Sequence, residues 1–202
     1  MPRLTDATKA ARRKQITDAA FECFTTNGYM NTSMSDIIKA SGLSSGSIYS
    51  HFTSKADIFA ATIESRLDEL EEIYTNLPDT PSPRDTLRII LDTSADLPIR
   101  TNFSAVLRLR LEATTNEELQ GLTGTVMSTV RSYIRRAVEP WARIKLGEHS
   151  TEEPTQDAVD RFTADIADAF MIIVQGYLVR TTLDDSVDQA HLQQLCLTML
   201  PA

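Results

Sequence analysis

Apolar positions recur at intervals of three and four residues along most of the chain, which is the pattern of amphipathic helices. The pattern predicts helices near residues 6–27, 34–41, 45–51, 54–76, 83–97, 100–114, 116–147, 155–183 and 186–200. Val106 to Glu112 alternates like a strand, but it consists of strong helix formers and has no second strand to pair with. The predicted fold class is therefore all-α throughout.

Residues that cap helices mark the predicted starts and ends. A hydroxyl residue with an acidic or amide residue three positions later predicts an N-cap. This pattern occurs at Ser33, Ser54, Ser82, Thr115 and Ser186. Helix ends are predicted by a following glycine or proline, at Gly28, Gly42, Pro78, Pro98 and Gly147.

The stretch "GLSSGSIYSHF" (Gly42 to Phe52) predicts a turn followed by a short helix with a polar outer face. Gly42 supplies the turn after the helix at 34–41, and Ser44 caps a helix whose buried residues are Ile48 and Phe52. Two short helices joined by a glycine turn form a helix-turn-helix. The residues left facing outward are Ser45, Gly46, Ser47, Tyr49 and Ser50. Small residues let such a helix enter a DNA major groove, where hydroxyls serve as donors or acceptors.

Three residues at or just beyond the end of this stretch are predicted to contact DNA phosphates. Tyr49 and His51 lie where they reach phosphates beside the groove. Lys55 lies in the first turn of the next helix, where backbone N–H groups also favour an anion. A serine-rich turn without a ligand is the alternative interpretation of the same stretch.

The segment from Ile16 to Phe59 resembles the DNA-binding domain of the TetR family of transcriptional regulators. The resemblance rests on "GY-x-x-TS" at 28–33, "G-x-S-x-G" at 42–46 and "Y-x-HF-x-S-K" at 49–55. It covers about a quarter of the chain, and it departs from the family pattern at Ile38 and Ser41, where alanine is usual. The resemblance implies DNA contacts at Ser44, Ser45, Gly46, Ser47, Tyr49, Ser50, His51 and Lys55, and a phosphate contact at Ser33.

The rest of the chain is predicted to form a second domain. We expect a helix-turn-helix domain at 1–53 and a helical ligand-binding and dimerisation domain at 54–202, with helix 54–76 connecting the two. The helix near 155–183 is apolar on nearly every side, so it must be covered from two directions. As the resemblance implies, this helix and the final helix are expected to form a four-helix bundle with a second copy, through Phe170, Ile173, Val174, Tyr177, Leu192, Leu195 and Met199. Burial of this helix inside one monomer is the alternative.

An apolar ligand pocket is a further expectation, implied mainly by the resemblance. Apolar residues share one face of the long helix before and after Pro140, and residues of neighbouring helices can face them. The candidate lining residues are Phe103, Leu107, Met127, Val130, Ile134, Trp141 and Phe170. A plain hydrophobic core is the alternative for each of them. Arg108 and Glu112 lie at i and i+4 and are expected to pair with each other.

Charge and chemistry narrow the function classes. Residues 1–14 carry five Lys or Arg and one Asp, and residues 1–60 carry seven against five, although the whole chain has a net charge of −8. A basic head on an acidic body suggests an anionic partner for the head. The three histidines lie without metal-ligand spacing, a Gly-rich phosphate loop or a nucleophile motif, so neither an enzyme nor a metal or cofactor site is expected.

Cys23 and Cys196 are expected to be buried thiols in a reducing cytoplasm, and the apolar run Ala169 to Val174 is far shorter than a membrane span. The sequence thus predicts a cytoplasmic, homodimeric regulator that binds palindromic double-stranded operator DNA. We expect a repressor that a small, largely apolar effector releases. A DNA-binding regulator without such an effector, controlled by a partner or acting as an activator, is the alternative.

Overall fold

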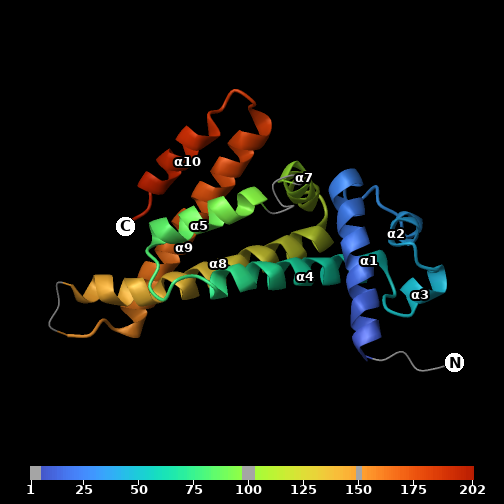
Figure 1. Cartoon of the computed structure of the whole chain (residues 1–202), viewed down its shortest axis with the longest axis horizontal. Helices are drawn as coiled ribbons and strands as arrows, with labels where there is room; N and C mark the ends of the chain where they lie inside the picture. The colour runs from blue at the N-terminus through green and yellow to red at the C-terminus, as the bar shows by residue number, and fades with distance from the viewer. Residues whose placement is uncertain (1–5, 97–102, 149–151) are drawn as a thin grey trace. The chain divides into compact units, whose positions relative to one another are not determined.

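The computed structural model describes residues 6–96, 103–148 and 152–202, with the side chains of 93–96, 103–106 and 118 left out. Every regular element in these ranges is a helix, as Figure 1 shows, and the predicted fold class is confirmed. The helices are α1 (Asp6–Asn27), α2 (Met34–Ser41), α3 (Ser45–Tyr49), α4 (Lys55–Thr75), α5 (Pro83–Asp96), α7 (Phe103–Ala113), α8 (Glu117–Gly147), α9 (Gln156–Leu183) and α10 (Gln189–Thr198).

The chain forms two compact units, which are described separately. Unit 1 comprises residues 1–69 and 105–126, and unit 2 comprises 70–104 and 127–202. Helices α4 and α8 therefore each contribute residues to both units. Compared with the predicted domains at 1–53 and 54–202, unit 1 also takes in most of α4, most of α7 and the start of α8.

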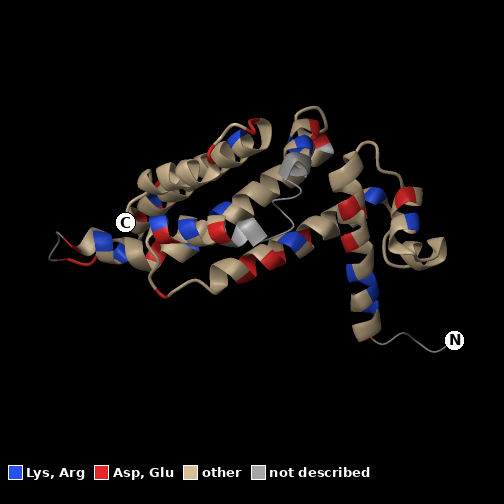
Figure 2. Cartoon of the chain, turned by 45° about the horizontal axis from the view of Figure 1, so that its top comes forward, with Lys and Arg blue, Asp and Glu red and all other residues tan. Residues whose placement is uncertain are grey.

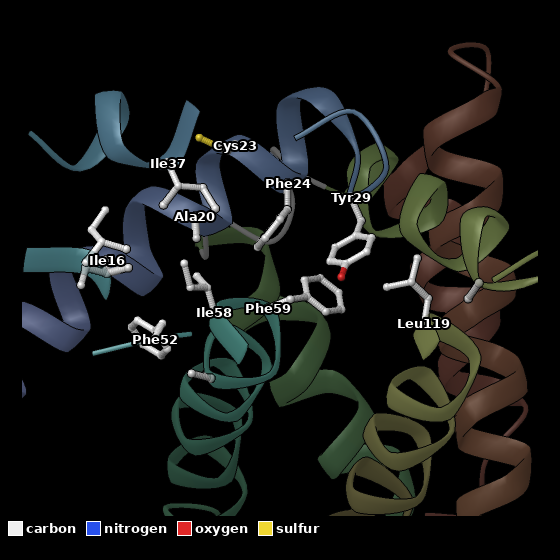
Figure 3. Close-up of a cluster of buried hydrophobic side chains, with 13 residues drawn as sticks. Ile16, Ala20, Cys23, Phe24, Tyr29, Ile37, Phe52, Ile58, Phe59 and Leu119 are labelled. Carbon is white, nitrogen blue, oxygen red and sulfur yellow. The ribbon is translucent and has the colours of Figure 1, made fainter. Parts of the chain in front are cut away.

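Unit 1 has one hydrophobic core. Its buried residues come from α1 to α4 and include Ile16, Phe24, Ile37, Ile48 and Ile58, and Ala113 of α7 and Leu119 of α8 complete it. Three aromatic rings meet in this core: Phe24 lies edge-on to Phe59 at 5.0 Å, and Tyr29 lies 4.8 Å from Phe59. Figure 3 shows Leu119 beside this group, so two helices distant in sequence close the core around α1.

Several predicted caps are present and two are displaced. Ser54 and Ser82 accept hydrogen bonds from the N–H groups of Asp57 and Asp85, as expected. At the start of α8, however, Asn116 instead of Thr115 accepts from the N–H of Leu119. At the start of α10, Asp188 instead of Ser186 accepts from the N–H of His191. Asparagine is a stronger N-cap residue than threonine, which explains the first displacement, whereas aspartate and serine are comparable N-cap residues.

In unit 2, α5, α9 and α10 pack together. Arg84 at the start of α5 ties down the end of α10, because its guanidinium donates to the carbonyl of Leu197 (3.0 Å) and to that of Leu200 (3.1 Å). These carbonyls have no partner within their own helix end, so Arg84 replaces the missing bonds. Arg131 of α8 forms a two-bond ion pair with Asp168 of α9.

The predicted dimer residues divide into two groups. Ile173, Val174 and Leu192 are half-buried, while Leu195 and Met199 are exposed. Phe170 and Tyr177 were predicted for the interface, but both are buried within unit 2 itself. The correction follows from helical geometry, because a helix that is apolar all round buries one side in its own chain and leaves another side uncovered. That exposed side carries Ile172 and Leu183, which are 72% and 71% exposed.

The predicted pocket residues are placed in both units. Ile134 and Phe170 are fully buried in unit 2, Met127, Val130 and Trp141 are half-buried there, and Trp141 stacks on Phe162 with ring centroids 5.9 Å apart. Leu107 belongs to unit 1, and the side chain of Phe103 lies outside the described residues. The pocket lining therefore stays a prediction.

Candidate nucleic-acid interface

The α2–turn–α3 segment has the local geometry that the sequence predicts. Gly42 ends α2 with φ of +66°, a left-handed conformation that glycine adopts without strain. Ser44 then caps α3 by accepting from the N–H of Ser47 at 3.2 Å. Ile48 and Phe52 are buried, as predicted, and they fix which side of α3 faces outward.

The outer side of α3 is polar and small. Ser45, Gly46 and Ser50 are exposed, Ser47 is half-buried, and Tyr49 is 51% exposed. The hydroxyl of Ser50 donates to the carbonyl of Ser47 at 2.6 Å, so its lone pairs stay available to an outside donor. His51 is half-buried at the end of the segment. The structure thus brings these six residues onto one short segment, and their contact with DNA stays a prediction.

Ser33 serves the start of α2. Its hydroxyl donates to the carboxylate of Asp36 at 2.6 Å and accepts from the N–H of Asp36, while the Asp36 carboxylate accepts from the N–H of Ser33. The hydrogen bonds from Ser33 lower the pKa of Asp36. Ser33 is exposed, so the capping role leaves the predicted phosphate contact sterically open.

Lys55 has a role that the sequence did not predict. Its ammonium group donates to the carbonyl of Tyr29 at 2.8 Å and to that of Thr32 at 2.9 Å, and it lies 4.3 Å from the centre of the Tyr29 ring. The prediction of a phosphate contact considered only the first turn of α4. Two of the three donors of Lys55 hold the segment between α1 and α2, and its contact with a phosphate stays a prediction.

The basic residues of the N-terminal segment gather on α1. In Figure 2 the half of α1 nearer the N-terminus carries Lys and Arg. Arg13 lies over the ring of Phe52 at 4.4 Å, which places this cation directly beside the end of the α3 segment. The charge pattern showed that the head is basic, but the approach of Arg13 to Phe52 depends on tertiary packing and could not be predicted.

Arg108 and Glu112 of α7 also differ from their prediction. Arg108 donates to the carbonyl of Thr26 at 2.9 Å. Glu112 accepts from the N–H groups of Tyr29 at 3.0 Å and Met30 at 3.2 Å. The expected i, i+4 pair is replaced because Arg108 binds a carbonyl in the last turn of α1 and Glu112 binds two N–H groups of the segment that follows. Backbone groups without another partner outweigh a surface ion pair.

Comparisons with known proteins agree with this geometry. The family model described as "Bacterial regulatory proteins, tetR family" matches residues 16–62. The transcriptional regulator AcrR of Shigella flexneri is 36% identical over 85 residues, which cover 40% of this chain and 40% of AcrR. The chain is thus matched to less than half the length of this curated relative.

Solved structures show the same fold over the whole chain. A TetR-family regulator from Rhodococcus sp. superposes with a TM-score of 0.72 at 20% identity, covering 94% of this chain and 96% of that one. FadR of Bacillus subtilis, solved in complex with stearoyl-CoA, gives a TM-score of 0.63 at 21% identity and covers 92% of this chain and 96% of its own. Residues 16–62 therefore match the family model of bacterial tetR regulators, and the solved structures, at 20% and 21% identity, show that this chain shares their fold.

Proposed function

We propose that this protein is a cytoplasmic, dimeric repressor that binds a palindromic operator through α3 and leaves it when a small, largely apolar molecule binds unit 2. The observation that carries the proposal is the outer side of α3, where Ser45, Gly46 and Ser47 stand over a buried Ile48. A helix whose first turn has no bulky side chain can approach base edges closely, and hydroxyls there can bind them.

Affinity for DNA would come from the cations and hydroxyls around α3. Arg13 beside Phe52, together with Tyr49 and His51, would contact phosphates, and such contacts fix the position of the helix in the groove. Lys55 would contribute indirectly, by holding the segment that precedes α2. Phosphate contacts release counterions, so the affinity should fall steeply with salt.

The dimer proposal rests on an uncovered apolar surface of unit 2. Ile172, Leu183, Leu195 and Met199, on α9 and α10, are between 44% and 72% exposed. Among the described residues, α9 is also the helix that is long and apolar enough to cross a membrane. Only 28% of its most apolar 18-residue stretch is buried within the chain. A second copy that covers this surface explains why α9 is apolar on its exposed side. We prefer this explanation to a membrane span because a DNA-binding regulator acts in the cytoplasm. Dimers that read palindromic DNA hold their recognition helices about 34–36 Å apart.

The effector proposal rests on the residues that line the interior of unit 2. Ile134 and Phe170 are buried and Met127, Val130 and Trp141 are half-buried, so a site among them would be apolar. FadR of Bacillus subtilis, a structural relative, was solved with stearoyl-CoA. An effector with an apolar part, such as an acyl chain, is therefore the class we propose.

Selection and titration of DNA test the proposal. The protein is used to enrich duplexes from a random library, and the affinity for the enriched duplex is measured by fluorescence anisotropy at several salt concentrations. Ser47→Ala should change the preference among related duplexes, whereas Arg13→Gln should weaken binding to all of them alike. A protein that enriches no sequence would refute the operator-binding function.

The effector is tested with acyl compounds of graded chain length. A compound that binds the folded protein raises its melting temperature, and by linkage the operator must weaken that compound by the same factor as the compound weakens the operator. Calorimetry with and without operator measures both. Equal affinities in the two titrations would contradict release by an effector.

A further inference from the structure

The segment between α1 and α2 is held from two sides by residues far from it in sequence. On one side, Glu112 of α7 accepts from the consecutive N–H groups of Tyr29 and Met30 through a single carboxylate oxygen, Oε2. On the other side, Lys55 of α4 donates to the carbonyl of Tyr29. Both peptide groups of Tyr29 are therefore fixed by side chains of other helices. We name residues 26–32 the α1–α2 turn.

The fit of Glu112 to this turn depends on Gly28. Gly28 has φ of +85°, and a Cβ atom placed there would lie 2.2 Å from Oε1 of Glu112. The carboxylate thus lies directly against the glycine backbone. Arg108, one helical turn earlier on α7, donates to the carbonyl of Thr26 on the other side of Gly28. The two side chains together contact both limbs of the α1–α2 turn, and we call them the α7 clamp.

The α1–α2 turn determines where α2 begins. Ser33, the N-cap of α2, directly follows Thr32, whose carbonyl binds Lys55. α2 leads through the Gly42 turn into α3, so a shift of the α1–α2 turn moves the outer side of α3 relative to α1. Shifts of about one ångström are enough to misalign hydrogen bonds, whose strength depends on distance and angle.

The α7 clamp also lies next to the start of a helix that continues into unit 2. Asn116 caps α8 and donates from its side-chain amide to the sulfur of Met30 at 3.4 Å. α8 then runs from Glu117 to Gly147, with residues from 127 onward in unit 2. A displacement of α8 along its axis would therefore act first on the contact of Asn116 with Met30, whose N–H binds Glu112.

From these contacts we propose that Glu112 is a positioning residue for DNA binding: from α7 it fixes the α1–α2 turn and thereby aligns α3 with the operator. The inference rests on the proposed function, because it assumes that α3 reads DNA. It extends that function to a residue outside the helix-turn-helix, and it names the contact through which α8 acts on the DNA-binding segment.

Three variants of the full-length protein test this role. Glu112→Leu removes the acceptor, while Glu112→Gln keeps an oxygen that can accept from both N–H groups. Glu117→Leu is the matched control, because Glu117 is an exposed glutamate in the first turn of α8. Each is titrated with the enriched operator and with a scrambled duplex, and the active fraction is determined by stoichiometric titration, so that the affinity refers to folded protein alone.

In Glu112→Leu the alignment of α3 is no longer held before binding and must be restored on the operator. The cost is at most the free energy of the lost hydrogen bonds to a charged acceptor, a factor of about ten to a hundred, so operator binding should weaken by about tenfold. Binding to the scrambled duplex should stay within about threefold, since phosphate contacts do not require the alignment of α3. Glu112→Gln should restore most of the operator affinity, and Glu117→Leu should behave as the unmodified protein.

A residue with a merely structural role would lower the melting temperature and the active fraction without changing the ratio of operator to scrambled affinity. An unchanged ratio in Glu112→Leu would therefore overturn the inference while leaving the proposed function intact. If Glu112→Leu does not fold, Arg108→Leu removes one bond of the same clamp and should lower the same ratio by a smaller factor. An unmodified protein without operator preference would instead overturn the proposed function.

Discussion

Replacing Gly28 by alanine should destabilise the protein more than the same change at Gly42, although both glycines end a helix in the left-handed region. At Gly42, with φ of +66°, a Cβ meets nothing within 4 Å, so Gly42→Ala adds only the left-handed strain of about 1–2 kcal/mol. At Gly28 the Cβ would lie 2.2 Å from Oε1 of Glu112. The side chain of Glu112 must then move, and its hydrogen bonds to Tyr29 and Met30 are lost.

The additional cost is the loss of hydrogen bonds to a charged acceptor, about 1.5–3 kcal/mol. The expected total for Gly28→Ala is therefore about 2.5–5 kcal/mol, by addition of this loss to the left-handed strain. Urea unfolding followed by far-UV circular dichroism, at one fixed protein concentration, measures both variants, and the fixed concentration matters because dimerisation contributes to stability.

A double-mutant cycle separates the two contributions. In a Glu112→Ala background the carboxylate is absent, so Gly28→Ala should cost about as much as Gly42→Ala, roughly 1–2 kcal/mol. Equal costs of the two alanine variants in the unmodified background, together with a coupling energy near zero, would refute the idea that Glu112 and Gly28 fit one another.

Three further predictions concern other parts of the chain. Ile172→Asp should convert a dimer into a monomer in sedimentation measurements at micromolar concentration, because an unpaired charge in a covered apolar surface costs several kcal/mol; Ile144→Asp, at an exposed position of α8, should leave the dimer intact. Hydrogen bonds, first of all from Thr53, lower the pKa of Asp57. The stability that this carboxylate adds is therefore complete above its unfolded pKa of about 3.9 and is lost as the pH falls through the folded pKa. In urea titrations at falling pH, Asp57→Asn should lose less unfolding free energy than the unmodified protein. Ser82→Ala removes the N-cap of α5 and should cost about 0.5–2 kcal/mol in the same assay, and a loss near zero would contradict the capping role.

The helices and the helix-turn-helix could be predicted from sequence because their signals are local. The spacing of Ile48 and Phe52 fixes the outer side of α3, and the glycine at position 42 permits the left-handed turn. The predicted N-caps were wrong only where two candidate residues lie close together in sequence. Asn116 and Asp188 lie within two positions of the predicted Thr115 and Ser186. A pattern rule does not weigh such neighbours: Asn116 is the better N-cap of the first pair, and the two residues of the second pair are comparable.

The contacts of α7 could not be predicted, because they join residues more than eighty positions apart. Glu112 stands four positions after Arg108, and spacing alone favours a local ion pair over a contact with an unknown partner. Gly28 was expected only as a helix end, and any such glycine has the same signature. The bonds of Lys55 to backbone carbonyls were missed for a related reason, since a lysine that binds carbonyls and one that binds phosphate look identical in sequence.

The dimer residues show a third limit. Periodicity predicted that α9 is covered on two sides, and covering of the second side stays a prediction. Periodicity also did not say which side the chain covers itself. Phe170 and Tyr177 turned out to be buried within unit 2, and Ile172 is the residue left exposed. The assignment depends on how α5 and α10 pack against α9, and that packing is tertiary information.

The free energy of the hydrogen bonds in the α7 clamp indicates how small a movement would be enough for the proposed regulation. A tenfold loss of operator affinity requires about 1.4 kcal/mol, and the hydrogen bonds of Glu112, worth about 1.5–3 kcal/mol, set the upper limit of what their loss in one of two states would contribute. An effector in unit 2 therefore needs no rearrangement of the hydrophobic core of unit 1. In the proposed mechanism it would need only to prefer a position of α8 in which Asn116 loses Met30 and Glu112 of α7 no longer reaches the N–H groups of Tyr29 and Met30. The hydrogen bond from Lys55 to the carbonyl of Tyr29 involves neither α7 nor α8, so it would be kept while the alignment of α3 is lost.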